Sequence, residues 1–188
     1  MDTNKTDKHW DILQSEYLHR RPWLTVRRDT VRLPDGTVNP EFYILEYPEW
    51  VNVIALTADG LFVLVRQYRH GIRKTLLELV AGVVDPTDTC PLEAARRELL
   101  EETGFGDGQW EPFLTVAPNA SAMTNCSHTF LARDVRQIST QHLEKTEDID
   151  VVLLSRDEVY GRLQAGEFVQ GLMAAPLWKF FCEDEQCR

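Results

Sequence analysis

The sequence has no apolar run approaching the roughly 20 residues that a helix needs to cross a bilayer. The N-terminus, MDTNKTDKHWDILQ, lacks the apolar core of a signal peptide. The cysteines form no Cys-x-x-Cys pair, and the histidines show no spacing typical of a metal site. These absences predict a cytoplasmic protein with no membrane partner and with reduced, structural cysteines. The cysteines are Cys90, Cys126, Cys182 and Cys187.

Positive charge is also scarce. The chain has 20 Lys and Arg residues against 30 Asp and Glu residues, which gives a formal net charge of −10. Binding to a nucleic-acid backbone depends on clustered Lys and Arg, so a nucleic acid is not expected as the partner. A small phosphorylated substrate remains compatible with this charge, because divalent cations can screen an acidic site from an anionic ligand.

What is present favours a single folded domain, with at most a small appendage. The chain has 188 residues, of which 43% are apolar, enough for a proper hydrophobic core. There is no internal repeat or low-complexity tract. Apolar runs bounded by turn residues predict strands, and the Ala-Asp-Gly at 58–60 predicts a hairpin. The runs cover residues 23–36, 41–47, 50–69, 75–84, 110–116, 128–133 and 148–155.

Helices are predicted in three segments. Residues 85–105 begin with turn residues, place Pro91 at a first helical position and reach Gly104, a typical C-terminal stop.

The second predicted helix, residues 155–167, begins with a capping box of Ser155 and Glu158. The third covers residues 171–181, where Pro176 either starts the helix or kinks it. Strands with interspersed helices predict an α/β (α+β) fold, in which helices flank a mixed sheet.

The stretch RRELLEETGF, residues 96–105, places Glu98, Glu101 and Glu102 within about one helical turn. Residues three and four apart are neighbours on a helix, so these like charges repel each other. They form either a solvated helix face supported by ion pairs to Arg97, or a set of oxygen ligands for Mg²⁺ or Mn²⁺. In the second case a cation turns the repulsion into affinity, and Arg97 orients Glu101 through a hydrogen-bonded pair.

The stretch GVVDPTDTCPLEAARRELLEETGF, residues 82–105 and hereafter the box, resembles the Nudix box. That pattern is Gly, five residues, Glu, seven residues, Arg-Glu, an apolar residue, any residue, Glu-Glu, any residue, Gly and an apolar residue. The half from Arg97 to Phe105 matches fully. The resemblance to the Nudix hydrolase superfamily extends over about residues 23–180 and implies a Nudix-type mixed β-sheet sandwich with a small N-terminal β region.

The first half of the box departs from the family pattern. One extra residue lies between Gly82 and Arg97, and Asp88 or Thr89 falls where the family has an early Glu. In Nudix proteins that Glu mainly supports the loop, so its loss bears on loop geometry more than on metal binding.

The segments QYRHG and LLELVAG, which lie within residues 67–82, resemble the subgroup that hydrolyses ADP-ribose and other nucleoside diphosphate sugars. This resemblance implies that Arg69 contacts substrate phosphate and that Glu78 lies near the substrate. It also implies that the Ala81 carbonyl is a metal ligand beside the glutamates. The segment EKTEDIDVV resembles the acidic loop that supplies a catalytic carboxylate, here Glu147, which is otherwise an ordinary residue of an acidic loop.

The implied reaction is Mg²⁺-dependent hydrolysis of a pyrophosphate bond, with Mn²⁺ as an alternative cofactor, giving a nucleoside monophosphate and a sugar phosphate. Hydroxide is repelled by the anionic diphosphate, so catalysis consists mostly of positioning and charge neutralisation. The expected metal ligands are Ala81, Glu98, Glu101 and Glu102. The expected catalytic groups are Glu98, Glu101, Glu102 and Glu147, with Glu147 or a box carboxylate as general base. Arg69 and Glu78 are the expected substrate-binding groups.

Related enzymes are commonly homodimers, so residues 1–48 are expected to be an N-terminal region that contributes to dimerisation. Residues 49–188 are then the hydrolase domain. Trp10, Trp23 and Trp50 line a base pocket or a dimer interface, although for Trp23 and Trp50 the hydrophobic core is the default expectation.

The substrate's base and sugar stay open. ADP-ribose-specific relatives carry a Gly-rich, often acidic loop after the box, whereas residues 116–130 here have Pro118 but no Gly and no acid. The polar residues of this loop are ordinary loop residues or sugar contacts; they are Asn119, Ser121, Thr124 and Asn125. The alternative functions are a non-catalytic Nudix-like sensor that binds a nucleotide sugar and a protein-interaction module.

Overall fold

The computed structural model describes residues 8–186, which divide into two compact units. The N-terminal unit comprises the chain up to Tyr47 together with Asn119–Asn125. The larger unit comprises Pro48–Pro118 and the chain from Cys126 onwards. None of the described helices is long and apolar enough to cross a bilayer.

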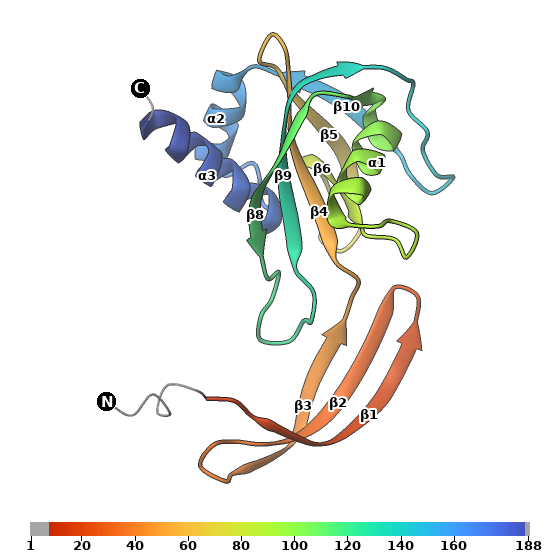
Figure 1. Cartoon of the computed structure of the whole chain (residues 1–188), viewed down its shortest axis with the longest axis vertical. Helices are drawn as coiled ribbons and strands as arrows, with labels where there is room; N and C mark the ends of the chain where they lie inside the picture. Colours follow the sequence, from red (N-terminus) through yellow and green to blue (C-terminus); the bar gives the residue numbers. More distant parts are fainter. Residues whose placement is uncertain (1–7, 187–188) are drawn as a thin grey trace. The chain divides into compact units, whose positions relative to one another are not determined.

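The N-terminal unit is an antiparallel three-stranded sheet of β1 (Asp11–Arg21), β2 (Leu24–Arg32) and β3 (Val38–Glu46), in that order (Figure 1). The sequence did not predict β1. Every residue of β1 is exposed, so neither face of the strand is selected to be apolar and the pattern that marks a strand is weak. The short segment Asn119–Asn125 joins this unit through hydrogen bonds to the backbone of Leu45.

The larger unit is built on a mixed sheet in the order β10-β5-β6-β4-β9-β7, with β8 paired to β9. Only β4 and β9 run parallel among the pairs in the described chain. The strands are β4 (Trp50–Thr57), β5 (Phe62–Arg69), β6 (Lys74–Val83), β7 (Phe105–Gly106), β8 (Gln109–Val116), β9 (Ser127–Gln137) and β10 (Ile149–Leu154).

The predicted hairpin of β4 and β5 is confined to its turn. The two strands pair only at Ala55–Val63 and Leu56–Phe62, and β6 then enters between them. Much of β4, β5 and β6 is buried. Such apolar strands favour the centre of a sheet, and β6, which follows the hairpin in the chain, pairs with β4 on one side and β5 on the other.

Helices cover both faces of this sheet (Figure 1). Helix α1 (Pro91–Thr103) covers one face, and α2 (Arg156–Gln164) and α3 (Gly171–Gln186) cover the other. Side chains of β4 alternate between the two layers, with Val53 in the α1 core and Ile54 in the α2–α3 core. This arrangement confirms the predicted α/β (α+β) fold class with flanking helices.

The helix ends follow the predicted signals. Pro91 is the first residue of α1, and Gly104 adopts the left-handed conformation with φ 76° at its C-terminal cap. Ser155 and Glu158 form the predicted capping box of α2. Pro176 lies inside α3 rather than at its start, and this helix continues to Gln186.

Replacing two glycines of the larger unit by alanine is expected to change the stability of the fold in opposite directions. Alanine at Gly104 is strained by the positive φ, and its Cβ would collide with the Ser139 carbonyl, so we expect Gly104→Ala to lower the melting temperature by several degrees. Gly161 lies inside α2 with open space around it. We expect Gly161→Ala to raise stability by about 0.5–1 kcal/mol. Thermal unfolding of both variants tests the pair; equal shifts would contradict the assigned cap.

Candidate active site

The last residues of β6 contact α1 at Arg97 and Glu98, and this contact brings the two halves of the box together. Gly82 faces Glu98 so closely that a Cβ at position 82 would collide with the Glu98 carboxyl. The Glu98 side chain is only 14% exposed. Glycine at this position therefore makes the space in which the Glu98 carboxylate sits beside the strand.

Arg97 joins this loop to the helix through several hydrogen bonds. One terminal nitrogen donates to Glu98 Oε1 at 2.9 Å and to Glu101 Oε2 at 3.0 Å. The other donates to the Val83 carbonyl at 2.9 Å and to Asp88 Oδ2 at 3.0 Å. The guanidinium thus holds two box glutamates and the loop in one arrangement.

Of the two residues that fall where the family has its early Glu, Asp88 and not Thr89 contacts Arg97. Its side chain is 8% exposed, and both of its carboxylate oxygens accept hydrogen bonds from Arg97. One of these oxygens also accepts the Asp85 backbone N–H at 2.9 Å, and the hydrogen bonds from Arg97 hold the pKa of Asp88 below its usual value. Thr89 instead donates to Glu93. The inserted residue is thereby accommodated, because a shorter carboxylate still reaches Arg97.

Glu98 and Glu102 are held in an environment that opposes their negative charge. Burial raises the pKa of Glu98 to about 7, and the charges of Glu101 and Glu147 add to this effect while Arg97 opposes it. Burial raises the pKa of Glu102 to about 8, with further contributions from Glu98 and Glu147. The folded state therefore favours the protonated carboxyls, and ionisation as the pH rises toward these values costs stability in the metal-free protein.

Glu147 is near enough to both helix carboxylates to raise their pKa values. It lies in the loop between β9 and β10, where its side chain accepts the Glu144 backbone N–H at 2.8 Å. The structure therefore brings Glu147 close to Glu98 and Glu102 although it lies more than 40 residues further along the chain.

Arg69 and Glu78 form an ion pair across the β5–β6 hairpin. Two guanidinium nitrogens of Arg69 donate to Glu78 Oε2 at 2.8 and 2.6 Å. Glu78 is 1% exposed, whereas the Arg69 side chain is 38% exposed and so remains accessible to a ligand. The charge of Arg69 also lowers the pKa of Glu102, which places both groups in one electrostatic environment.

Among the side chains that the structure describes, residues 8–183, no three of Asp, Glu, His or Cys are close enough to form a ready metal site. Arg97 occupies oxygens of Glu98 and Glu101, and the Glu101 side chain is 44% exposed. Two buried oxygens suit a cation nonetheless, because Glu78 Oε1 and Glu102 Oε2 have no hydrogen-bond partner. Hard divalent cations bind such oxygens, so the residues fit the ion, and the metal ligands stay a prediction.

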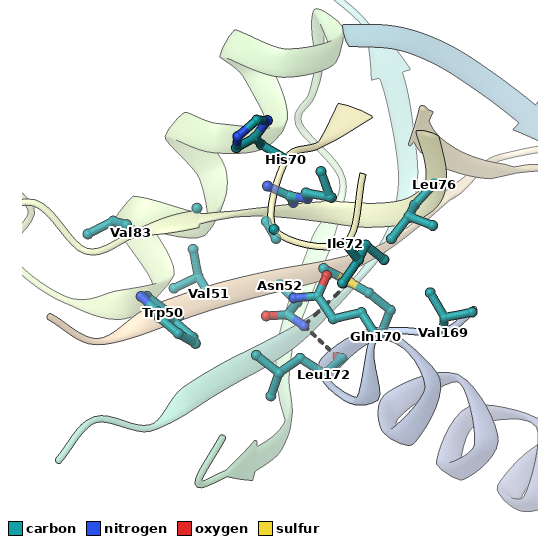
Figure 2. A pocket seen from close by; sticks show the side chains of 15 residues that line it. Trp50, Val51, Asn52, His70, Ile72, Leu76, Val83, Val169, Gln170 and Leu172 are labelled. Carbon is teal, nitrogen blue, oxygen red and sulfur yellow. Dashed lines mark hydrogen bonds between the residues drawn. The ribbon is translucent and has the colours of Figure 1, made fainter. Parts of the chain in front are cut away.

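A pocket of about 510 Å³ adjoins these groups (Figure 2). The lining of the pocket includes Arg69, Ala81 and Gly82, residues of the β5–β6 turn and the beginning of α3. Sequence reasoning identified Trp50 as a candidate pocket residue but missed His70 and Gln170. No local pattern could have identified these two residues, because the β5–β6 turn and the beginning of α3 line the same pocket only in the folded chain.

The structure also shows where three other residues considered in the sequence lie: Trp23, Asn119 and Trp10. Trp23 is 74% exposed, so the default expectation that it belongs to the core is wrong. Trp23 lies in the tight turn between β1 and β2, where its side chain is exposed. Asn119 accepts hydrogen bonds from the backbone and hydroxyl of Ser121, as expected of ordinary loop residues. Trp10 packs edge-on against Phe42 within the N-terminal unit.

Comparison with known proteins agrees with this geometry. Residues 47–173 match the model of the NUDIX domain, and residues 10–45 match that of the nucleoside diphosphate sugar hydrolase N-terminal domain. The chain belongs to the Nudix family. The predicted identity as a Nudix hydrolase of the nucleoside diphosphate sugar subgroup is confirmed. Nudix hydrolases generally use divalent metal ions.

Among curated relatives of this Nudix hydrolase is the ADP-ribose pyrophosphatase of Mycobacterium tuberculosis. It is 28% identical over 167 residues, which cover 88% of this chain and 80% of the relative. The methanol dehydrogenase activator of Bacillus methanolicus is 31% identical over 131 residues, covering 69% of this chain and 70% of the relative. The crystal structure of an ADP compounds hydrolase has the same fold, with a TM-score of 0.80, 21% identity and coverage of 94% and 95%.

The contact between Gly82 and Glu98 predicts a variant that loses activity without losing its fold. In Gly82→Ala the new Cβ displaces only the far end of the flexible Glu98 side chain, so we expect a melting temperature within a few degrees of wild type. We expect kcat of this Nudix hydrolase to fall by about 100-fold or more, because a carboxylate is moved from the reacting centre. Gly161→Ala is the control; wild-type turnover in Gly82→Ala would refute the assigned role of this contact.

Proposed function

We propose that this Nudix hydrolase cleaves the pyrophosphate bond of a nucleoside diphosphate sugar of the ADP-ribose type, with Mg²⁺ or Mn²⁺ as cofactor. The observation that carries the proposal is the pair of buried carboxylates, Glu98 and Glu102, together with Arg69, whose charge acts on Glu102 and which lines a pocket. The name of a relative that matches 88% of this chain, an ADP-ribose pyrophosphatase, supports the same substrate class.

The charges of the site suit a diphosphate. Nucleophilic attack on phosphorus is opposed by the negative charge of the substrate, so the enzyme must bring positive charge to the diphosphate oxygens. Arg69 supplies fixed positive charge, and its pairing with buried Glu78 orients the guanidinium while leaving part of it exposed. Ala81, Glu98, Glu101 and Glu102 are the groups that would hold the cation.

A bound divalent cation supplies Lewis acidity, lowering the pKa of water and neutralising phosphate charge. The chain's own residues perform the remaining tasks. Arg97 keeps Glu98 and Glu101 oriented and is itself held by Asp88. Glu147 lies close enough to raise the pKa values of Glu98 and Glu102. It is the proposed general base, which accepts the proton of the attacking water. The products are a nucleoside monophosphate and a sugar phosphate.

We expect Glu98→Gln and Glu102→Gln each to lower kcat by at least about 100-fold, because the neutral amide is a weaker ligand for a hard cation. Product formation from ADP-ribose, GDP-mannose, ADP-glucose and UDP-glucose, measured with Mg²⁺ and with a chelator, tests this.

Glu147→Gln should lower kcat while Mn²⁺ affinity stays unchanged. Glu111→Gln, an exposed change on β8, is the control. Near-wild-type turnover in both Glu98→Gln and Glu102→Gln would refute the assignment, and hydrolysis of no substrate would indicate a sensor.

The N-terminal region, residues 1–48, is proposed to mediate a homodimer, and residues 49–188 to form the hydrolase domain. The support is the apolar surface of β1, where exposed Ile12, Leu13, Tyr17 and Leu18 lie on a strand without any buried position. The free Cys90, Cys126 and Cys182 support a reducing compartment, the cytoplasm.

Light scattering at micromolar concentration should therefore give about twice the chain mass of 21.7 kDa. A double change of Ile12 and Leu18 to Lys should shift the protein to a monomer, because charge at the centre of an apolar interface is strongly unfavourable. The matched control is the change of Leu153 to Lys, also at an exposed apolar position but on β10 of the larger unit. A wild-type monomer would refute the dimer.

A further inference from the structure

The pocket beside the active site has a predominantly apolar wall. Its apolar lining includes Ile72 and Leu76 from the β5–β6 hairpin and Leu172 and Met173 from α3. Figure 2 shows His70 at one side of this pocket and Leu172 at the opposite side, with Gln170 between them. A wall of this kind favours a flat, uncharged ring over a sugar, whose hydroxyls require several hydrogen-bonding partners.

Two side-chain amides line the pocket, and one is already used by the fold. Asn52 donates to the Leu172 carbonyl at 2.7 Å and accepts from the Ser127 hydroxyl at 2.7 Å, so both ends of its amide are engaged. Asn52 is 2% exposed and ties the beginning of α3 to β4. Its role is to fix the wall of the pocket.

Gln170 is the amide left for a ligand. It is half-buried and lies just before α3, and its side chain has no hydrogen-bond partner within residues 8–186. Its backbone carbonyl accepts the N–H groups of Met173 and Ala174, so the main chain at this point is fixed by the helix. A held backbone with an unused amide facing an apolar pocket is the arrangement of a specificity residue.

We propose that this pocket binds the nucleobase of the substrate and that Gln170 recognises an adenine edge. The amide offers one donor and one acceptor side by side, which complements the amino group and adjacent ring nitrogen of adenine. The inference rests on the proposed function for the position of the diphosphate, which we place beside Arg69, Ala81 and Gly82, three residues that line the same pocket. The sugar phosphate then extends away from this pocket.

Exchange of the amide for a carboxylate gives the sharpest test. In Gln170→Glu the side chain has two acceptors and no donor, which suits the two N–H donors on the edge of guanine and opposes the acceptor nitrogen of adenine. Titration calorimetry with Mg²⁺ and 5′-AMP, 5′-GMP or ribose 5-phosphate measures binding without turnover. We expect wild type to bind AMP most tightly, and Gln170→Glu to weaken AMP by about tenfold while tightening GMP. Gln170→Leu should weaken both nucleotides.

Gln164→Glu is the matched control, because it makes the same chemical change at an exposed position at the end of α2 outside the pocket. It should leave both affinities unchanged. Tighter binding of ribose 5-phosphate than AMP by wild type would overturn the proposal, and so would equal losses of AMP and GMP in Gln170→Glu. Hydrolysis is assayed in parallel on the same proteins. Loss of base preference with intact hydrolysis refutes only this inference, and base preference without hydrolysis refutes only the proposed function.

Discussion

The guanidinium of Arg97 is the interaction on which the rest of the site depends. Glu98 and Glu102 lie where burial and neighbouring carboxylates oppose their charge, and a helix carrying such groups would turn them toward water unless something held them. Arg97 retains Glu98 beside the strand and at the same time fixes the loop through the Val83 carbonyl and Asp88. Arg97 thereby keeps Glu98 in a buried position where its negative charge is opposed by burial and by neighbouring carboxylates.

The sheet of the larger unit separates the acidic helix α1 from the helices α2 and α3. Helix α1 and its carboxylates lie on one face, and α2 and α3 lie on the other. The end of β6 serves both, because Gly82 packs against Glu98 and also lines the pocket that extends to α3. A substrate with a charged centre and an apolar ring can be held at such an edge, since each part meets the chemistry that suits it.

Asp88 illustrates how a family pattern can change without losing its physical content. The box of this chain is one residue longer than the family pattern and lacks the early Glu. In this chain a buried carboxylate, that of Asp88, accepts hydrogen bonds from Arg97 with both oxygens. A pattern counts residues along the chain, whereas the constraint is a distance between two charged groups, so an insertion and a shorter side chain can compensate each other.

The strands of the core, the ends of α1 and the cap of α2 were determined by the sequence alone, because apolar periodicity, Gly104 and the pair of Ser155 and Glu158 act over a few residues. The spacing of the acidic residues on α1 likewise predicted metal ligands, and that assignment stays a prediction. Only the tertiary structure decided that β6 separates β4 from β5, that Arg69 pairs with Glu78, and that Gln170 meets the pocket. These depend on contacts between segments distant in the chain, whose energies arise from burial and shape that no local pattern encodes.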